Sequence, residues 1–348
     1  MPDASCRSEM DRYERELAIR FQVPHAVAVS SGTVAIHLAL AALGIGTGDE
    51  VLVPALAPAS SVAPVLDVGA RPVFVDCGPS GAGLDLADME AKITVLSKAV
   101  MLVHQWGRTG DAQRTVEFAG AHGLRVIEDA SQAIGTNIDG APAGTLGDIG
   151  CFSTRAGNLL DSGEGGFLLT HDIEFAGACR TLRQHGQDPA TATTTPAVPG
   201  NSYRLANPLA AIARAKLADL DETLRDQARR TLLLTKHLLG ASGLVIPYAA
   251  GPESWNGHSL LAHLDMPAPR EFCAHLAVRG VPNSVGTYGL TSADQVPAFS
   301  AYVEQPCLRA RAVVDTMLAI SLPAKVTEDQ VREFATIIAS EALQWNPA

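Results

Sequence analysis

From Ala26 to Asp129 the sequence alternates short runs rich in β-branched residues with stretches that have helical apolar spacing. The runs are AVAVS at 26–30, VLVP at 51–54, PVFVD at 72–76, AVMLV at 99–103 and RVIED at 125–129. Helical stretches such as TVAIHLALAALG and AQRTVEFAGAHG lie between them and end at a glycine. Strands separated by helices favour a mainly parallel sheet with crossover helices. We therefore predict an α/β fold here.

The second half of the chain has a different pattern. A polar loop, DPATATTTPAVPGNS at 188–202, precedes a long helical stretch from Asn207 to Leu239. From about Gly240, short strand-like runs such as GLVIP and SLLAHLD alternate with helices, which is typical of a smaller α+β domain. We predict a large domain over residues 1–239, a small domain over residues 240–348, and a loop at 188–202 that acts as a lid or reaches another subunit.

The net charge limits the choice of partner. The 348 residues include 26 Lys and Arg against 37 Asp and Glu, a net charge of -11. Such a field repels phosphate backbones and anionic lipids, so we expect no nucleic acid and no membrane as partner. Proline interrupts the apolar stretches before they could span a bilayer, and Met1–Phe21 lacks the apolar core of a secretory signal. Six scattered cysteines without a CxxC pair predict no metal site and fit a reducing cytoplasm.

Two segments place polar chemistry at the ends of predicted strands. In SSGTVAIHLALAALG at 30–44, Gly32 and Thr33 open a helix whose free N–H groups favour a phosphate. A strand-to-helix turn without any ligand uses the same residue types. In VIEDASQAIG at 126–135, Asp129 ends a buried strand where open α/β sheets place their ligands, and Gln132 lies one turn further on. A lone acid at a strand end also serves as a helix N-cap.

The third segment is GTLGDIGCFSTRAGNLLDSGEGGFLLT at 144–170. Two strand-like runs, IGCFS and GGFLLT, flank a loop whose glycines permit unusual dihedral angles and close approach of a ligand. A hairpin that binds nothing could contain the same glycines. Taken in this order, the three segments are more specific than any one of them alone.

Together these segments resemble the DegT/StrS family of sugar aminotransferases, fold-type I proteins that use pyridoxal phosphate. The resemblance begins near YERELAIRF at 13–21 and passes through AVAVSSGTVAIHLAL, GIGTGDEVLVP, GARPVFVD, VIEDASQAIG, GTLGDIGCFS and GEGGFLLT. It continues through QHG at 184–186 to AISLP at 319–323 and so covers nearly the whole chain. It implies a large domain with a mainly parallel sheet and a smaller C-terminal α+β domain.

The resemblance also implies how a pyridoxal cofactor would be held. The backbone of Gly32 and Thr33 and the hydroxyl of Ser153 would form a cradle for its phosphate. Asp129 would pair with the pyridinium nitrogen, which keeps the ring protonated and therefore an electron sink. Gln132 would contact the ring hydroxyl.

The main departure from the family is at the lysine that holds the cofactor. The family pattern has FS, four residues and a lysine, then four residues and GEGG. Here the lysine position is Asn158, and the count to GEGG at 163–166 closes without a gap. The only lysines are at 92, 98, 216, 236 and 325, and Arg155 cannot form an imine because guanidinium stays protonated. Asparagine can neither hold the cofactor covalently nor shuttle a proton.

Other positions depart from the family as well. The family motif PSFTF has an aromatic residue that stacks on the ring, and this chain has Pro58 there. With the register fixed on Arg204, the asparagine that reaches the phosphate across the subunit interface becomes Ser202, and Asn201 stands one residue early. The family's N-terminal arm is mostly absent before Tyr13. We therefore expect a different substrate site.

Three functions stay open at this point. The first is an enzyme that binds pyridoxal phosphate or pyridoxamine phosphate non-covalently and dehydrates or isomerises a keto-sugar or related metabolite. Its base would be His104 or His185, although either histidine could simply be satisfied by packing. The second is a catalytically inactive partner subunit that completes the site of a lysine-bearing paralogue. The third is a cofactor-free enzyme that uses the phosphate cradle for its substrate. In each case we expect a small-molecule ligand and, by the resemblance, a homodimer.

Overall fold

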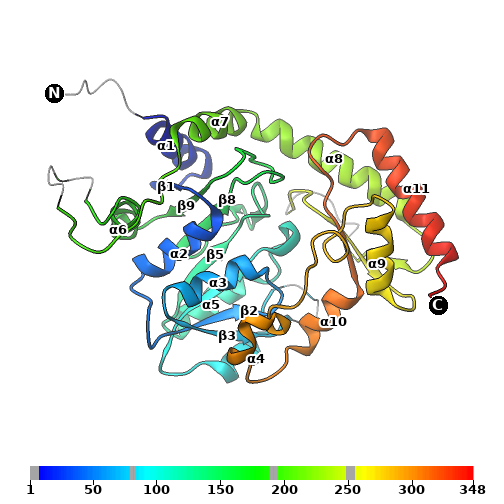
Figure 1. Cartoon of the computed structure of the whole chain (residues 1–348), viewed down its shortest axis with the longest axis horizontal. Helices are drawn as coiled ribbons and strands as arrows, with labels where there is room; N and C mark the ends of the chain where they lie inside the picture. Colours follow the sequence, from blue (N-terminus) through cyan, green and yellow to red (C-terminus); the bar gives the residue numbers. More distant parts are fainter. Residues whose placement is uncertain are drawn as a thin grey trace.

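The computed structural model describes residues 8–78, 81, 83–188, 191, 195–247 and 255–347. Within them, the larger part of the molecule is built on a seven-stranded sheet (Figure 1). In sheet order the strands are β1 (His25–Val29), β9 (Gly166–Thr170), β8 (Ile149–Ser153), β5 (Arg125–Asp129), β4 (Ser97–Val103), β2 (Glu50–Pro54) and β3 (Arg71–Val75). β9 is antiparallel to β1 and β8, and the pairs from β8 to β3 are parallel. The predicted mainly parallel sheet is confirmed.

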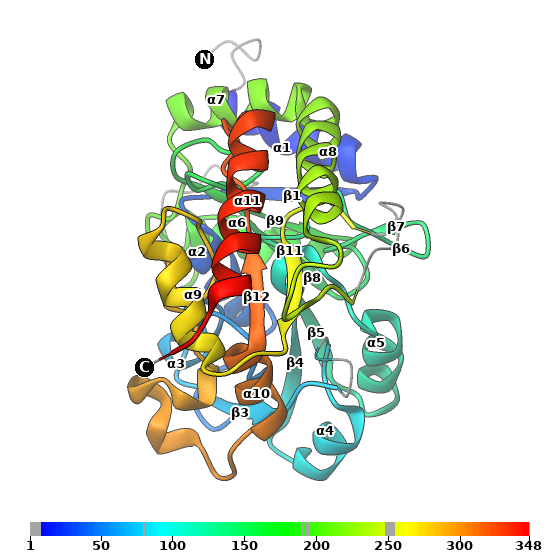
Figure 2. The same ribbon diagram turned by 90° about the vertical axis from the view of Figure 1, so that its right-hand side faces the viewer.

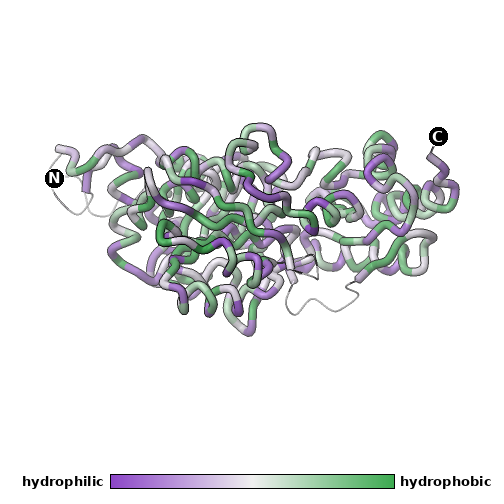
Figure 3. The backbone as a smooth tube through the Cα atoms, turned by 90° about the horizontal axis from the view of Figure 1, so that it is seen from below, coloured by the Kyte–Doolittle hydropathy of each residue, from purple (hydrophilic) through white to green (hydrophobic). Residues whose placement is uncertain are grey.

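Both faces of this sheet are buried, which explains the uninterrupted apolar runs of its strands. Val51 and Val53 of β2 belong to one apolar core, and Leu52 between them belongs to the other. Successive side chains of a strand point to opposite faces, so a sheet covered on both sides needs apolar residues at every position. Figure 3 shows such hydrophobic strands running through the middle of the molecule.

Helices close each of the two cores. The core around Val51 is covered by α2 (Gly32–Ala42), α3 (Ala59–Asp67) and α6 (Ile173–Arg183). The core around Leu52 is covered by α1 (Glu9–Phe21), α4 (Leu86–Lys92), α5 (Ala112–Ala121) and α7 (Asn207–Ala218). α1 illustrates the pattern, since its buried Tyr13, Leu17 and Phe21 are spaced four residues apart and so share one face of the helix.

The C-terminal part forms a second, smaller layer of strands and helices (Figure 2). Its antiparallel sheet has the order β10 (Leu244–Val245), β11 (Leu260–Leu264) and β12 (Met317–Ile320). The helices of this part are α9 (Pro269–Val278), α10 (Leu308–Thr316) and α11 (Glu328–Gln344), and α11 packs along α8 (Leu220–Leu238). Short segments complete the chain: η1 (Gln105–Gly107), β6 (Asn137–Ile138), β7 (Ala141–Pro142), η3 (Ala293–Gln295) and η4 (Pro297–Tyr302).

The prediction of one helical stretch from Asn207 to Leu239 was wrong in one respect, because the stretch is two helices. α7 ends at Ala218 and α8 begins at Leu220. The carbonyl of Asp219 accepts hydrogen bonds from the N–H of Thr223, at 3.0 Å, and from its hydroxyl, at 3.1 Å. Asp219 is therefore the N-cap of a new helix, at a position where no glycine or proline marks a break.

Two further expectations concern the domain limits and the polar loop. The predicted boundary between residues 239 and 240 falls directly after α8 and stays a prediction. Residues 189, 190 and 192–194 of the predicted loop at 188–202 lie outside the described residues.

Within the part of the chain that the structure describes, no helix is both long and apolar enough to cross a bilayer. Cys151 is a buried residue of β8, as expected of a small core residue.

Candidate active site

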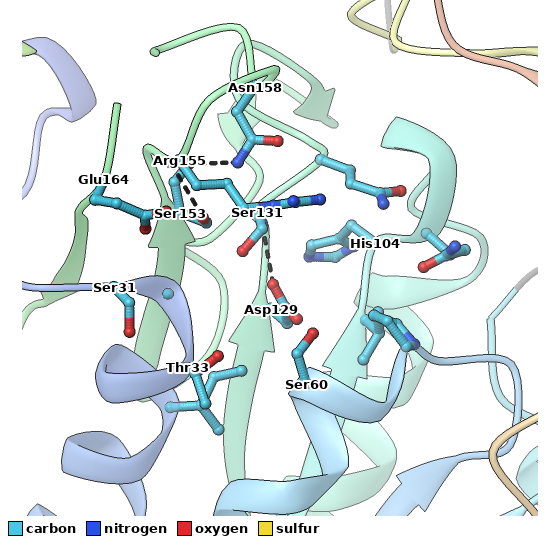
Figure 4. Close-up of a pocket in the computed structure, with 16 residues that line it drawn as sticks. Ser31, Thr33, Ser60, His104, Asp129, Ser131, Ser153, Arg155, Asn158 and Glu164 are labelled. Atoms are coloured by element: carbon cyan, nitrogen blue, oxygen red, sulfur yellow. Dashed lines mark hydrogen bonds between the residues drawn. The ribbon is translucent and has the colours of Figure 1, made fainter. Parts of the chain in front are cut away.

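A cavity of about 410 Å³ opens at the carboxyl ends of β4, β5 and β8 (Figure 4). His104 follows β4, Asp129 ends β5 and Ser153 ends β8. The carboxyl ends of parallel strands meet at one edge of a sheet, where ligands of open α/β folds bind. The predicted site residues that line this cavity are Gly32, Thr33, His104, Asp129, Gln132, Ser153 and Asn158.

The start of α2 and the end of β8 form one wall of the cavity. Ser31 is the N-cap of α2, and its hydroxyl accepts the N–H of Val34 at 3.1 Å. The N–H groups of Gly32 and Thr33, at the first two helical positions, have no acceptor within the helix. A Cβ atom on Gly32 would lie 2.7 Å from the Cβ of Ser153, so only glycine lets the two segments approach this closely. Two backbone donors and the Ser153 hydroxyl are thus gathered at a positive helix end, which suits a phosphate.

Asp129 provides an acceptor in the floor of the cavity. The residue is 7% exposed. One carboxylate oxygen accepts the hydroxyl of Ser61 at 2.5 Å, and the other accepts the N–H of Ser131 at 3.1 Å. Each carboxylate oxygen has two acceptor positions, so both oxygens can accept a further donor from a ligand. The two protein contacts fix the orientation of the carboxylate.

Gln132 is oriented by contacts on both its side chain and its backbone. Its Oε1 accepts the N–H of Trp106 at 2.5 Å, which leaves the Nε2 group as the donor available to a ligand. Asn256, a buried residue of the C-terminal part, donates from Nδ2 to the carbonyls of Gln132 at 2.8 Å and Ile134 at 2.9 Å. A residue of the C-terminal part therefore holds the backbone that carries Gln132.

His104 forms a buried pair with Glu128. Nε2 of His104 lies 2.8 Å from Oε2 of Glu128, and both side chains are almost fully buried. Burial raises the pKa of Glu128, but the hydrogen bond and charge of His104 and the N–H groups of Gly147 and Gly144 lower it more, so the net pKa is below the ordinary value. Glu128 is thus a carboxylate, which can only accept hydrogen bonds. Nε2 of His104 is therefore the nitrogen that donates to Glu128, and Nδ1 is the ring nitrogen that Glu128 does not engage.

Comparison with known proteins identifies the relatives of this chain. A family model described as the DegT/DnrJ/EryC1/StrS aminotransferase family matches residues 5–339. The chain belongs to this family. A UDP-N-acetyl-3-dehydro-alpha-D-glucosamine 3-aminotransferase of Acidithiobacillus ferrooxidans is 34% identical over 326 residues, which are 93% of this chain and 86% of that protein.

Other proteins match this chain more locally or by structure. A GDP-perosamine synthase of Caulobacter vibrioides is 43% identical over 217 residues, 62% of this chain and 58% of that protein. The match thus spans less than two thirds of that relative. The solved structure of S. venezuelae DesV in complex with a ketimine intermediate has a TM-score of 0.85 at 28% identity, covering 98% of this chain and 91% of that one. A 3-amino-5-hydroxybenzoic acid synthase has a TM-score of 0.87 at 26% identity, covering 97% and 91%.

Asn158 stands where the family resemblance predicts a lysine, and it lines the cavity. Its Nδ2 donates a hydrogen bond to the carbonyl of Ser153 at 2.9 Å (Figure 4). All five lysines of the chain belong to the described residues, and none of them lines the cavity. Lys92 is the only one that is not exposed, and its amine is bound to Asp88 and the carbonyl of Phe74.

Some residues that line the cavity were not predicted from the sequence. Arg155 lines the cavity, whereas the sequence indicated only that it cannot form an imine. Its position, three residues before Asn158 in the glycine-rich loop, was the available signal. Pro58 does line the cavity, as the register with the family motif predicted. The unpredicted lining residues with polar side chains also include Ser31, Ser60, Gln105, Ser131 and Glu164.

His185 and Ser202 do not line this cavity. His185 is exposed, has a φ of 57°, and donates its N–H to the carbonyl of Asn201 at 3.0 Å. Ser202 is exposed and forms an isolated bridge with Gln184. The backbone carbonyl of the next residue, Tyr203, accepts the N–H of Ser30 at 2.9 Å. This segment therefore runs beside the start of the cradle. A contact of Ser202 with the cavity of a second subunit stays a prediction.

Proposed function

We propose that this family member binds pyridoxal phosphate or pyridoxamine phosphate without a covalent bond to lysine. We further propose that it dehydrates or isomerises a keto-sugar or related metabolite. One observation carries the proposal: the cavity has every predicted cofactor-contacting residue of one subunit, but none of the five lysines. A standard transaminase needs a lysine amine beside the ring, both to hold the cofactor and to move protons.

The groups in the cavity fit a pyridoxal-type cofactor. Gly32, Thr33 and Ser153 supply N–H and hydroxyl donors for its phosphate. Asp129 supplies a carboxylate for a protonated ring nitrogen, and the Nε2 group of Gln132 is available to the ring oxygen. Pro58 offers the ring an apolar surface in place of an aromatic one. When bound, the amine form supplies a reactive amine and an electron sink.

His104 is the base that this chain can offer in place of a lysine. It lines the cavity, and Glu128 keeps the proton on Nε2. Nδ1 can therefore take a proton from a bound substrate while the carboxylate of Glu128 stabilises the resulting positive ring. Asn158 has no basic atom and instead supports the backbone of Ser153.

The names of the relatives support a sugar-like substrate. They include nucleotide-sugar enzymes and L-glutamine:2-deoxy-scyllo-inosose aminotransferases. We also propose a homodimer in which Ser202 of one copy reaches the cavity of the other, because Ser202 lies outside the cavity of its own chain. Light scattering should give the mass of a dimer. A stable monomer at micromolar concentration would contradict the dimer.

The experiment that tests the proposed function is a binding titration of the purified chain with pyridoxamine phosphate and with pyridoxal phosphate. We expect one molecule per chain, release on dialysis, and no transaminase turnover with ordinary amino donors. Absence of binding for both compounds would contradict the proposal and favour a cofactor-free enzyme on the same cradle. Activity that appears only after addition of a lysine-bearing family member would instead favour an inactive partner subunit.

A further inference from the structure

Arg155 is an exposed cation that lines the cavity, and its guanidinium has no acceptor among the described residues. Figure 4 shows its side chain extended from the loop after β8 across the cavity, on the side of His104. Among the described residues no carboxylate or carbonyl pairs with its guanidinium, and neither Asp129 nor Glu164, which share the cavity, forms an ion pair with it.

Among the described residues the exposed Arg225 has no ion pair either, and Arg155 differs from it in lining the cavity. Other arginines are bound by the protein itself. Arg183 is buried and is bound to Glu14 and to the carbonyl of Ala28. Arg214 is bound to Glu9 and Glu16. A guanidinium has five N–H donors in a planar fork and stays charged at any ordinary pH. The fork of Arg155 is therefore open to a ligand in the cavity.

The loop that carries Arg155 is held by hydrogen bonds on both sides of it. The N–H of Thr154 donates to the carbonyl of Gly165 at 2.9 Å, and the N–H of Ala156 donates to the carbonyl of Gly163 at 2.7 Å. The hydroxyls of Thr154 and Ser162 are 2.7 Å apart. The backbone of Arg155 is thus fixed before a ligand arrives, so binding costs chiefly the ordering of its side chain.

We propose that Arg155 binds an oxyanion of the substrate, a carboxylate or a phosphate, at a position separate from the phosphate cradle of Gly32, Thr33 and Ser153. Guanidinium binds both groups through two parallel hydrogen bonds. The substrate is then a keto metabolite that bears an acidic group, and Arg155 orients that group while the reacting carbon faces His104. This inference rests on the proposed function, because it assumes that the cavity is the ligand site.

Calorimetric titration with two probes tests the assignment. Glutarate represents a carboxylate ligand and inorganic pyrophosphate a phosphate ligand, and both are titrated into protein saturated with pyridoxamine phosphate and into protein without it. The variants are Arg155→Gln, which removes the charge, and Arg155→Lys, which keeps the charge but loses the fork. Arg225→Gln is the matched control, since Arg225 is an exposed residue of α8.

We expect one of the two probes to lose at least about tenfold in affinity with Arg155→Gln, to lose less with Arg155→Lys, and to be unaffected by Arg225→Gln. The probe that responds identifies the acidic group as carboxylate or phosphate. Affinity for pyridoxamine phosphate itself should change less than the affinity for that probe. Equal affinity of the unmodified chain and Arg155→Gln for both probes, or no binding of either, would overturn the assignment. If the unmodified chain does not bind pyridoxamine phosphate, that result contradicts the proposed function alone. The two probes still report on Arg155 in protein without the cofactor.

Discussion

Asn158 donates a hydrogen bond from Nδ2 to the backbone carbonyl of Ser153 at 2.9 Å. The residue at the predicted lysine position is therefore joined to the residue whose hydroxyl belongs to the cradle. The amide of Asn158 stabilises this wall of the cavity. Removing its hydrogen bond should lower the free energy of unfolding by about 1 kcal/mol. The contact gives Asn158 a structural role in the wall of the cavity.

Replacing Asn158 by lysine should restore covalent chemistry. The new amine lies in the same cavity as Asp129 and Gln132, so it can form an imine with pyridoxal phosphate. We expect Asn158→Lys to be labelled at position 158 after borohydride reduction, as measured by peptide mass spectrometry. Asn158→Gln is the matched control, because it keeps an amide and adds no amine. A lysine variant that binds pyridoxal phosphate but carries no label would count against this geometry.

Removing the charge of Asp129 should weaken binding of the cofactor. Asparagine keeps one oxygen, which can accept the N–H of Ser131, and its Nδ2 can donate to the hydroxyl of Ser61 in place of the present bond. It has no carboxylate to form a charge-assisted bond with a protonated ring. We expect Asp129→Asn to raise the Kd of pyridoxamine phosphate by about tenfold or more. The control is Asp139→Asn at an exposed position with a φ of 49°, a conformation that asparagine tolerates. An unchanged Kd would show that Asp129 does not face the ring.

Much of this cavity follows from the sequence because it depends on local order. Asp129 and Ser153 end strands, and Gly32 begins a helix, so sheet topology alone brings them to one edge. Asn256 could not be predicted, because its contact with Gln132 joins residues 124 positions apart and has no local pattern. The direction of the long Arg155 side chain depends on the folded loop. The break between α7 and α8 at Asp219 could not be predicted, because no glycine or proline is present there.

A methyl group at Gly32 should damage the cradle. The Cβ of an alanine would lie 2.7 Å from the Cβ of Ser153 and 3.2 Å from its Cα, so the start of α2 must move away from β8. We expect Gly32→Ala to lower the free energy of unfolding by about 1–3 kcal/mol and to weaken pyridoxamine phosphate binding. Urea unfolding and a binding titration measure the two effects. Gly177→Ala in α6, where a Cβ meets nothing within 4 Å, should be neutral or stabilising. Equal behaviour of the two variants would refute the steric argument.

Burial of His258 should make the folded protein less stable in mild acid than at neutral pH. Burial lowers its pKa to about 4, whereas an unfolded histidine titrates near about 6.5. Only the unfolded chain takes up the proton between these values, so this stability is complete above about pH 6.5 and is lost progressively as the pH falls towards 4. The free energy of unfolding should fall by about 2 kcal/mol from about pH 7 to about pH 5.

Urea unfolding across this pH range measures the contribution of His258. His258→Gln should flatten the profile, because glutamine can keep a hydrogen bond to Ser259 and does not titrate. His122→Gln at an exposed position is the control and should leave the slope unchanged. The same slope in His258→Gln as in the unmodified chain would assign the pH dependence to another group.

The most direct test of non-covalent cofactor binding is borohydride reduction of the unmodified chain after incubation with pyridoxal phosphate, followed by intact-mass and peptide mass spectrometry. We predict that one cofactor per chain binds before reduction and that the reduced cofactor separates from an unlabelled chain on denaturation. The reason is that no lysine amine lies in the cavity, where Asn158 occupies the predicted position. Stoichiometric labelling of any one of the five lysines would contradict the account.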